Sequence, residues 1–248
     1  MKAPYVLVLD VGTTGIKGLV FDRTYSVISR AYAPLKKQFP KPGWVEQDPH
    51  EILKKSQHVL REAMTLSQVN PQDILRFGIT NQRETAILWN QNTGEPIYPA
   101  IVWEDRRTQS YCDILAFNHN ETVLERTGLP IDTYFSATKI QWLLEHVEEA
   151  QSLNDKRLLR FGTVDTWLAW NLCLETPHVT DYTNAARTLL FNLHSLQWDG
   201  ELTNLFGVPT TALPRALPSQ HGFGTLKEEI IGAPIPLHAI CGDQQSSM

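Results

Sequence analysis

The sequence predicts a mixed α/β fold with one central sheet, an antiparallel strand meander at its start and helices on both faces of the sheet. Three short apolar segments joined by tight turns occupy residues 6–33. Apolar strand-like segments then alternate with amphipathic helical segments over the rest of the 248 residues. No repeat or interior linker interrupts this alternation, which favours a single domain.

Composition restricts the class of protein. Hydrophobic residues make up 42% of the chain, charged residues make up 20%, and the formal net charge is -5. This acidic balance argues against a nucleic-acid partner, which requires a basic excess. No segment is long and apolar enough to cross a bilayer, so we expect no membrane partner. Cys112, Cys173 and Cys241 are widely spaced, which argues against a disulfide framework or zinc site and favours a cytoplasmic location.

The opening meander has three strands. Residues 6–10 form a continuous apolar run that ends in Asp10, and residues 12–15 (G-T-T-G) supply a tight turn. Residues 16–22 resume with apolar and β-branched side chains, and residues 27–33 complete the meander. This order differs from the strand–helix opening of a dinucleotide-binding fold.

The first helix is expected to begin after Asp48, which is a good N-cap residue. Pro49 suits the first helical position, and Glu51 completes a capping box. Apolar periodicity then predicts the following elements: a strand over 76–80, a polar loop over 81–85, strands over 86–89 and 100–103, a helix starting within 104–108, a helix over 138–149, a strand over 161–165, a helix over 166–174 and a strand over 237–241.

The turn that follows Asp10 is a candidate phosphate site. Gly12, Thr13 and Thr14 are small residues whose backbone N–H groups can surround phosphate oxygens, and the two hydroxyls add donors. A carboxylate at the strand end could hold Mg²⁺, usually through water. A plain hairpin turn with an exposed aspartate is an equally good interpretation of these residues alone. The sequence contains neither G-x-x-x-x-G-K-[ST] nor G-x-G-x-x-G, so a P-loop or dinucleotide site is not supported.

Polar and aromatic residues that follow strands indicate a second candidate site. Arg83 and Glu84 are adjacent in the loop over 81–85, and loops at strand ends carry ligand contacts in open α/β sheets. A donor beside an acceptor suits a polyol, although such a pair is more often solvated surface. Trp103 and Tyr134 could pack against the C–H face of a small polyol, or could belong to the core.

The motif G-D-Q-Q (residues 242–245) follows the predicted strand over 237–241. Asp243 could accept the proton of an attacking hydroxyl. Considered alone, the same residue could equally be the N-cap of a following helix.

Together, in this order, these motifs resemble the FGGY family of carbohydrate kinases, and the resemblance covers essentially the whole chain. It implies a ribonuclease-H-like sheet of the actin, hexokinase and sugar-kinase superfamily, with the active site in a cleft between two such domains. The stretches that carry it are G-W-V-E-Q-D-P (43–49), G-I-T-N-Q-R-E-T (78–85), A-I-V-W-E-D-R-R-T (100–108), Y-F-S-A-T-K (134–139), F-G-T-V-D-T-W-L (161–168), H-V-T-D-Y-T-N-A-A-R-T (178–188) and G-D-Q-Q.

The resemblance also implies a role for each candidate residue. Asp10 would position Mg²⁺, through water, next to ATP. Gly12, Thr13 and Thr14 would hold the ATP phosphates, with Lys17 nearby. The polyol pocket would be lined by Arg83, Glu84, Trp103, Tyr134, Asp243 and Gln244. Asp243 would also be the base on the attacking hydroxyl.

The reaction implied is ATP-dependent phosphorylation of a small polyol, with glycerol favoured. A family kinase for another polyol or for a ketose such as xylulose is one alternative, and a non-catalytic binding or scaffold module is another. Two residues depart from the pattern of the glycerol-phosphorylating members: Gly15 stands where Ser is usual, and Lys17 stands where Arg is usual.

Residues 1–248 are expected to form the N-terminal, substrate-binding domain, because G-D-Q-Q lies three residues before Met248. A second, nucleotide-binding domain would lie outside this chain, so the isolated chain should phosphorylate its substrate hardly at all. The full-length protein is expected to be a homo-oligomer. One geometric requirement underlies these expectations: Asp10 and Asp243 must face one shared crevice.

Overall fold

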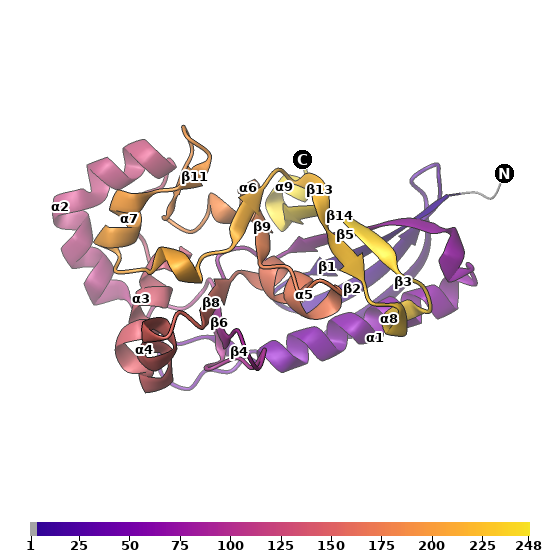
Figure 1. Cartoon of the computed structure of the whole chain (residues 1–248), viewed down its shortest axis with the longest axis horizontal. Helices are drawn as coiled ribbons and strands as arrows, with labels where there is room; N and C mark the ends of the chain where they lie inside the picture. The colour runs from indigo at the N-terminus through magenta and orange to yellow at the C-terminus, as the bar shows by residue number, and fades with distance from the viewer. Residues whose placement is uncertain (1–3) are drawn as a thin grey trace.

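The computed structural model describes residues 4–248, which form a mixed α/β structure around a six-stranded sheet (Figure 1). The strand order is β13-β14-β5-β1-β2-β3. The strands are β1 (Tyr5–Val11), β2 (Gly15–Phe21), β3 (Val27–Pro34), β5 (Ile74–Asn81), β13 (Gln220–Leu226) and β14 (Ile235–Gly242). β1, β2 and β3 pair antiparallel, which confirms the predicted meander. β1, β5 and β14 pair in parallel, and β13 pairs antiparallel with β14.

The predicted first helix is α1 (Pro49–Ser67), and it begins as the sequence indicates. The Asp48 carboxylate accepts a hydrogen bond from the His50 N–H at 2.9 Å. The Glu51 carboxylate pairs with Lys55 Nζ one turn further on, at 2.6 Å. The buried side chains of α1 face β2 and β3, and the approach is close at Gly18 of β2: a Cβ there would lie 2.4 Å from the Val59 carbonyl oxygen.

The remaining elements include α2, which is as long as α1, and several shorter helices and strand pairs. The helices are α2 (Gln109–Thr127), α3 (Ser136–His146), α4 (Glu148–Asp155), α5 (Val164–Leu172), α6 (Tyr182–Ala185), α7 (Gly200–Leu205), α8 (Glu228–Ile231) and α9 (Asp243–Ser246), with 3₁₀ turns at Pro71–Asp73 and Thr210–Ala212. The two-stranded pairs are β4 (Glu46–Gln47) with β7 (Ala100–Ile101), β6 (Ile87–Asn90) with β8 (Leu159–Gly162), β9 (Val179–Asp181) with β12 (Arg215–Leu217), and β10 (Phe191–Asn192) with β11 (Gln197–Trp198).

Two predicted boundaries are wrong because buried side chains hold the backbone in turns. Residues 104–108 do not start a helix, since α2 begins at Gln109. The Asp105 carboxylate accepts hydrogen bonds from the Val45 and Arg107 N–H groups, and this fixes a turn instead. The same turn cuts the strand predicted over 100–103 to Ala100–Ile101.

Two further predicted boundaries, both in the segment from α3 to α5, differ from the observed ones. The helix predicted over 138–149 is divided at Val147, whose extended backbone separates α3 from α4. The strand predicted over 161–165 ends at Gly162, and Asp165 already belongs to α5. The buried Asp165 carboxylate accepts the Thr163 hydroxyl, which holds the junction as a helix start.

Helices lie on both faces of the sheet. Apolar residues of α1, α5 and α8 share one core cluster with Leu7, Phe77 and Leu237 of the sheet. On the opposite face, Ser246 of α9 contacts Thr80 of β5. A second apolar cluster joins α2, α3, α7, β6 and β8 beyond the end of the sheet, at the left of Figure 1.

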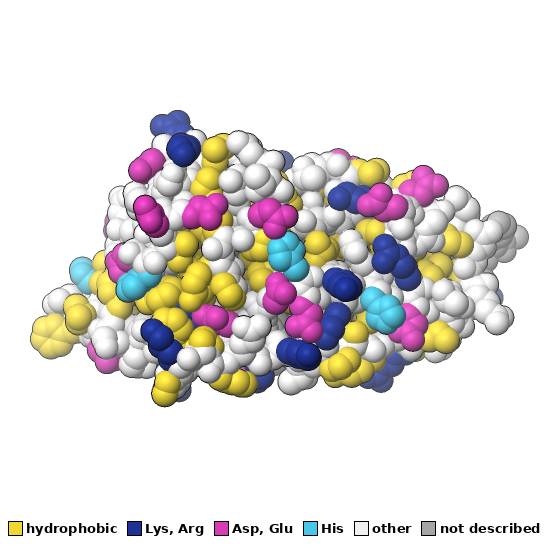
Figure 2. Space-filling view, turned by 90° about the horizontal axis from the view of Figure 1, so that it is seen from below, with side chains coloured by type: hydrophobic (Ala, Val, Ile, Leu, Met, Phe, Trp, Pro, Cys, Tyr) yellow, Lys and Arg dark blue, Asp and Glu magenta, His cyan; other side chains and the backbone are white. Residues whose placement is uncertain are grey.

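The face that α1 presents to solvent carries acidic, basic and histidine side chains side by side (Figure 2). Contacts one helical turn apart lie on this helix: Lys55 forms an ion pair with Glu51, and His58 Nε2 lies 3.5 Å from a Glu62 carboxylate oxygen. Within residues 4–248, no helix combines the length and the apolar character that spanning a membrane requires.

Candidate active site

Three parallel strands end at one edge of the sheet and bring the first and last motifs together. In register, Asp10 of β1 lies beside Thr80 of β5, and Thr80 lies beside Cys241 of β14. Neighbouring strands are about 4.8 Å apart, so the backbones at Asp10 and Cys241 are about 10 Å apart. Asp243 follows directly at the start of α9. The Thr80 and Ser246 hydroxyl oxygens are 2.8 Å apart, which puts α9 on the sheet face that Asp10 shares with Thr80.

Asp243 and Arg83 approach each other at this edge. Arg83 Nε lies 3.4 Å from the nearer Asp243 carboxylate oxygen, and the Arg83 side chain is 9% exposed against 36% for Asp243. Gly242 permits the contact, because a Cβ there would lie 2.4 Å from Arg83 Cδ. Arg83 also donates to Gln245 Oε1 at 3.2 Å, whereas the neighbouring Gln244, the predicted contact, is exposed. Among the described residues, Arg83 Nε–H is buried and makes no aligned hydrogen bond, and the Asp243 carboxylate is its ion-pair partner.

Glu84 is held in place by a contact that the sequence did not indicate. Its carboxylate accepts a hydrogen bond from Arg187 Nε at 2.7 Å, and its carbonyl accepts the Ser136 hydroxyl. Burial raises the pKa of the Glu84 carboxyl, while the hydrogen bond from Arg187 acts in the opposite direction. Glu84 also has a left-handed backbone, with φ of 61°, which non-glycine residues adopt at a cost of about 1–3 kcal/mol. Strain and buried charge together are typical of a functional site.

The two predicted aromatic residues lie together at the same site. The Trp103 and Tyr134 ring centroids are 5.2 Å apart, and the rings are tilted by 54°. They line a cavity of about 230 Å³ together with side chains from both flanking loops: Glu104, Arg106, Asp132 and Thr133. Neither ring is fully buried, so both can contact a small ligand as well as the core.

Thr13 joins the aromatic pair to the candidate phosphate turn. Its hydroxyl accepts from Trp103 Nε1 at 2.9 Å and donates to Gln82 Oε1 at 3.3 Å. Its carbonyl accepts from Gln47 Nε2 at 2.8 Å, and Gln47 in turn accepts from Gln82. These four side chains hold the turn in a fixed position beside the cavity.

Lys17 pairs with Asp10 in this structure. The two lie opposite each other in the β1–β2 register, and Lys17 Nζ is 2.7 Å from an Asp10 carboxylate oxygen. Both side chains are partly exposed, and such pairs contribute at most about 1 kcal/mol. Lys17 can therefore exchange Asp10 for a phosphate at small cost, which also frees the carboxylate.

A comparison with known families identifies the family of this chain. The model of the N-terminal domain of the FGGY family of carbohydrate kinases matches residues 5–248. The chain belongs to the FGGY family of carbohydrate kinases.

Curated relatives of this chain include proteins named glycerol kinase. The chain is 47% identical to glycerol kinase 2 of Thermotoga maritima over 98% of this chain and 49% of that protein. It is 47% identical to the glycerol kinase of Paraburkholderia xenovorans over 100% of this chain and 50% of that protein. The chain thus spans about half the length of the curated relatives it matches.

Solved structures of two kinases share the fold. Plasmodium falciparum glycerol kinase with ADP matches with a TM-score of 0.93 at 33% identity, over 99% of this chain and 49% of that one. The xylulose kinase of Rhodospirillum rubrum matches with a TM-score of 0.87, over 98% of this chain and 50% of that one. At 22% identity the latter shows the fold alone.

Lys139 is a residue of this candidate site that the sequence analysis missed. Its side chain is fully buried, and Nζ donates to the carbonyls of Thr133, Tyr134 and Phe135. Burial lowers the pKa of Lys139 to about 8. The ammonium thus fixes the backbone that carries Tyr134. The signal was present in the sequence, because Lys139 shares the buried face of α3 with Leu143.

Arg107 holds the Trp103 loop from behind, and it too was missed. The guanidinium pairs with Glu46 at 2.7 Å and with Asp105 at 2.9 Å, and its side chain has no exposed surface. Its carbon Cζ lies 3.8 Å from the Trp44 ring centroid and 4.7 Å from that of Trp142. A lysine could not reproduce this planar, two-carboxylate contact.

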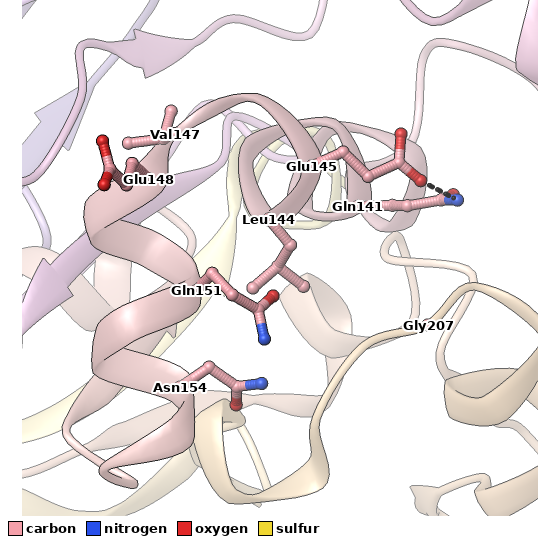
Figure 3. Close-up of a pocket in the computed structure, with 8 residues that line it drawn as sticks. All are labelled: Gln141, Leu144, Glu145, Val147, Glu148, Gln151, Asn154 and Gly207. Atoms are coloured by element: carbon pink, nitrogen blue, oxygen red, sulfur yellow. Dashed lines mark hydrogen bonds between the residues drawn. The ribbon is translucent and has the colours of Figure 1, made fainter.

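A cavity larger than the one beside Trp103 lies elsewhere among the described residues. It has a volume of about 460 Å³ and is formed by α3, α4 and the turn at Gly207 (Figure 3). Most side chains that line this cavity are amides and carboxylates. None of its lining residues belongs to the site at the strand ends. The side chains that line it are Gln141, Leu144, Glu145, Val147, Glu148, Gln151 and Asn154. The candidate site therefore does not coincide with this larger cavity.

Proposed function

We propose that this protein transfers the γ-phosphoryl group of ATP to a hydroxyl of glycerol. The observation that supports the proposal is that β1, β5 and β14 end at a common sheet edge, next to the Gly12–Thr14 turn and Asp243. The Trp103–Tyr134 pair and the Arg83 guanidinium lie beside the turn and Asp243. The distances between these groups suit a ligand of the size of a small polyol. The 47% identity to proteins named glycerol kinase supports the choice of substrate.

Asp243 would orient the attacking hydroxyl. In phosphoryl transfer the protein mainly aligns the nucleophile and leaving group and neutralises charge. A carboxylate is a much weaker base than an alkoxide, so Asp243 would accept the proton late, as the new P–O bond forms. Arg83 and Glu84 would fix the other hydroxyls, since a polyol hydroxyl both donates and accepts. Trp103 and Tyr134 would pack against the C–H groups of the polyol. Gln244 would be a further polyol contact.

The nucleotide phosphates would lie at the Gly12–Thr14 turn and accept from the N–H groups of Thr13 and Thr14, with Lys17 turning from Asp10 towards them. The Gly12 N–H already donates to the Gly15 carbonyl at 3.0 Å, so Gly12 would serve by its small size. Asp10 fits Mg²⁺ held through water, since magnesium keeps most of its water shell and needs few protein ligands. Among residues 4–248 there is no group of three or more acidic, histidine or cysteine side chains that could enclose a metal ion, which agrees with a site completed by phosphates. Bound Mg²⁺ would neutralise charge on the transferring phosphoryl group.

The cellular setting is part of the same proposal. All three cysteines are free thiols in the structure, which supports a reducing, cytoplasmic location. We expect a homo-oligomer with no nucleic-acid or membrane partner. Size-exclusion chromatography with light scattering would check the oligomeric state.

A substrate panel tests the function. The protein expressed from its complete reading frame should phosphorylate glycerol with a higher kcat/KM than xylulose, gluconate or other polyols. Preference for a five-carbon ketose would replace glycerol by the alternative that Gly15 and Lys17 allow. Absence of phosphoryl transfer to every compound would favour a binding or scaffold module.

The substitution Asp243→Asn tests the role of the carboxylate. We expect kcat to fall by about 10²–10⁴-fold, because the hydroxyl loses its proton acceptor. The KM for glycerol should change much less. Asp113→Asn, on the exposed side of α2, is the matched control and should leave both constants unchanged. A variant at Asp243 that keeps wild-type kcat would contradict the assigned role.

A further inference from the structure

Tyr32 stands in the same row as the two charged residues of the candidate nucleotide site. It lies opposite Lys17 in the β2–β3 register, and Lys17 lies opposite Asp10 in the β1–β2 register. Directly opposed side chains of neighbouring strands share one face of a sheet. A phenol, an ammonium and a carboxylate therefore follow one another across three strands, and the Tyr32 residue is 52% exposed.

Gly15 is what allows the Tyr32 ring to lie there. A Cβ at Gly15 would be 2.4 Å from the Tyr32 hydroxyl oxygen and 2.5 and 2.6 Å from two ring carbons. Any larger residue would displace the ring. The phenolic hydroxyl therefore occupies the place that a side chain at position 15 would take, directly after the Gly12–Thr14 turn.

The hydroxyl is only weakly engaged by the protein. It lies 3.4 Å from the Thr14 carbonyl oxygen, which already accepts the Leu35 N–H at 3.0 Å. A hydrogen bond of that length is weak, so the Tyr32 hydroxyl can donate to a better acceptor instead at little cost. A phosphate oxygen is such an acceptor, because hydrogen bonds to ionised oxygens are about twice as strong as neutral ones.

We propose that the Tyr32 hydroxyl is a further phosphate donor of the nucleotide site, supplied from β3 because Gly15 leaves its place open. The inference rests on the proposed function, since it requires a nucleotide at the Gly12–Thr14 turn. Tyr32 acts on the nucleotide and not on the polyol, because Arg83 and Asp243 lie on the other side of β1, towards β5 and β14.

The first test removes the hydroxyl and keeps the ring. In the protein expressed from its complete reading frame, Tyr32→Phe raises the KM for ATP about fivefold, which is typical for the loss of one hydrogen bond. The KM for glycerol and the temperature of unfolding stay unchanged. Tyr25→Phe is the matched control, since Tyr25 is 85% exposed in the connection between the same two strands.

The second test uses the contact between the two residues. Gly15→Ala displaces the ring and raises the KM for ATP as Tyr32→Phe does, and the two changes together are less than additive because both remove one hydroxyl. Tyr32→Ala combined with Gly15→Ser puts a hydroxyl back on the turn and recovers most of the affinity that Tyr32→Ala alone loses. Gly222→Ala controls for the added Cβ, which meets no atom within 4 Å there.

The outcomes separate this inference from the proposed function. If the wild type is an active kinase and Tyr32→Phe has the same KM for ATP, the inference is overturned and the proposed function stands. Substitutions at Tyr32 that change only the unfolding temperature also overturn it, because the ring then merely packs over a strand glycine. A wild-type protein that transfers phosphate to no polyol or ketose overturns the proposed function, and the inference fails with it.

Discussion

The two halves of the molecule are stabilised in different ways. The sheet half, with β1–β3 and α1, buries long apolar side chains in a regular pattern, and its core cluster contains residues such as Leu7, Leu9 and Val20. The half around α2, α3 and α4 is less regular and encloses charged groups, among them Asp105 and Lys139, which are at most 1% exposed. The sheet half positions the turn that we propose for phosphate, whereas the other half positions the aromatic pair.

The two kinds of burial have different structural consequences. Apolar burial is non-directional and stabilises the sheet without selecting one loop conformation. A buried ammonium or guanidinium must be satisfied by particular acceptors, so it selects one arrangement of the surrounding backbone. Lys139 and Arg107 each do this for one of the two aromatic rings.

The largest expected effect lies at Asp165, in α5 between the two halves. Its buried carboxylate accepts hydroxyls from Thr163 and Thr180, and burial, with repulsion from Asp181 as the next cause, raises its pKa to about 7. The protonated form is thus favoured by the fold, and this contribution is complete below about pH 4 and is lost as the pH rises through 7. Relative to Asp165→Asn, the wild type should lose several kcal/mol of unfolding free energy between pH 5 and pH 8.

Urea unfolding at several pH values measures this difference. Asp199→Asn is the control, because the pKa of Asp199 is lowered to about 2. Its contribution is lost only as the pH falls through that value, so this pair of proteins should show a constant difference from pH 5 to pH 8. A constant difference for Asp165 as well would show that its carboxyl is ionised throughout the range.

The second effect concerns the irregular half. Lys139→Met leaves the three carbonyls that its ammonium serves without a donor, and we expect unfolding free energy to fall by about 2–4 kcal/mol. The KM for glycerol should rise with it, since Tyr134 loses its anchor. Lys54→Met on the exposed face of α1 should change the unfolding free energy by about 0.5 kcal/mol or less. Equal effects of the two substitutions would remove the distinction drawn between the halves.

The third effect concerns the sheet half. Gly18→Ala places a methyl group 2.4 Å from the Val59 carbonyl oxygen of α1, so helix and sheet must separate at a cost of about 1–3 kcal/mol. Gly78→Ala in β5 is the matched change, because its nearest neighbour would be at an ordinary 3.7 Å. Chemical unfolding should show a clear loss for the first variant and nearly none for the second. Similar values would indicate that α1 moves freely on the sheet.

The regular half was largely predictable from sequence. Each strand of the meander is an apolar run bounded by a turn, and each was found within about two residues of its predicted ends. The first helix was found because its N-cap and proline are local signals. The family resemblance came from motifs in the same positions, and the family match confirms it.

The contacts that hold the candidate site were not predictable in the same way. Glu84 meets Arg187, and Arg107 meets Glu46, across long stretches of chain that no local pattern connects. The helix boundary near Asp105 failed for the same reason, since its carboxylate binds the distant Val45 N–H. Motifs named the residues that would meet a ligand, but the partners that position them depend on tertiary packing.

The central claim is that the Asp10 turn and Asp243 share one site, and a distance measurement tests it most directly. Mn²⁺ with a non-hydrolysable ATP analogue would replace the magnesium nucleotide. The paramagnetic broadening of the ¹³C resonances of labelled glycerol would then report the distance between glycerol and Mn²⁺. With the two strand ends about 10 Å apart, we expect strong broadening of the glycerol resonances that disappears in Asp10→Asn. If glycerol and the manganese nucleotide both bind and the glycerol lines stay sharp, the two carboxylates do not serve one site.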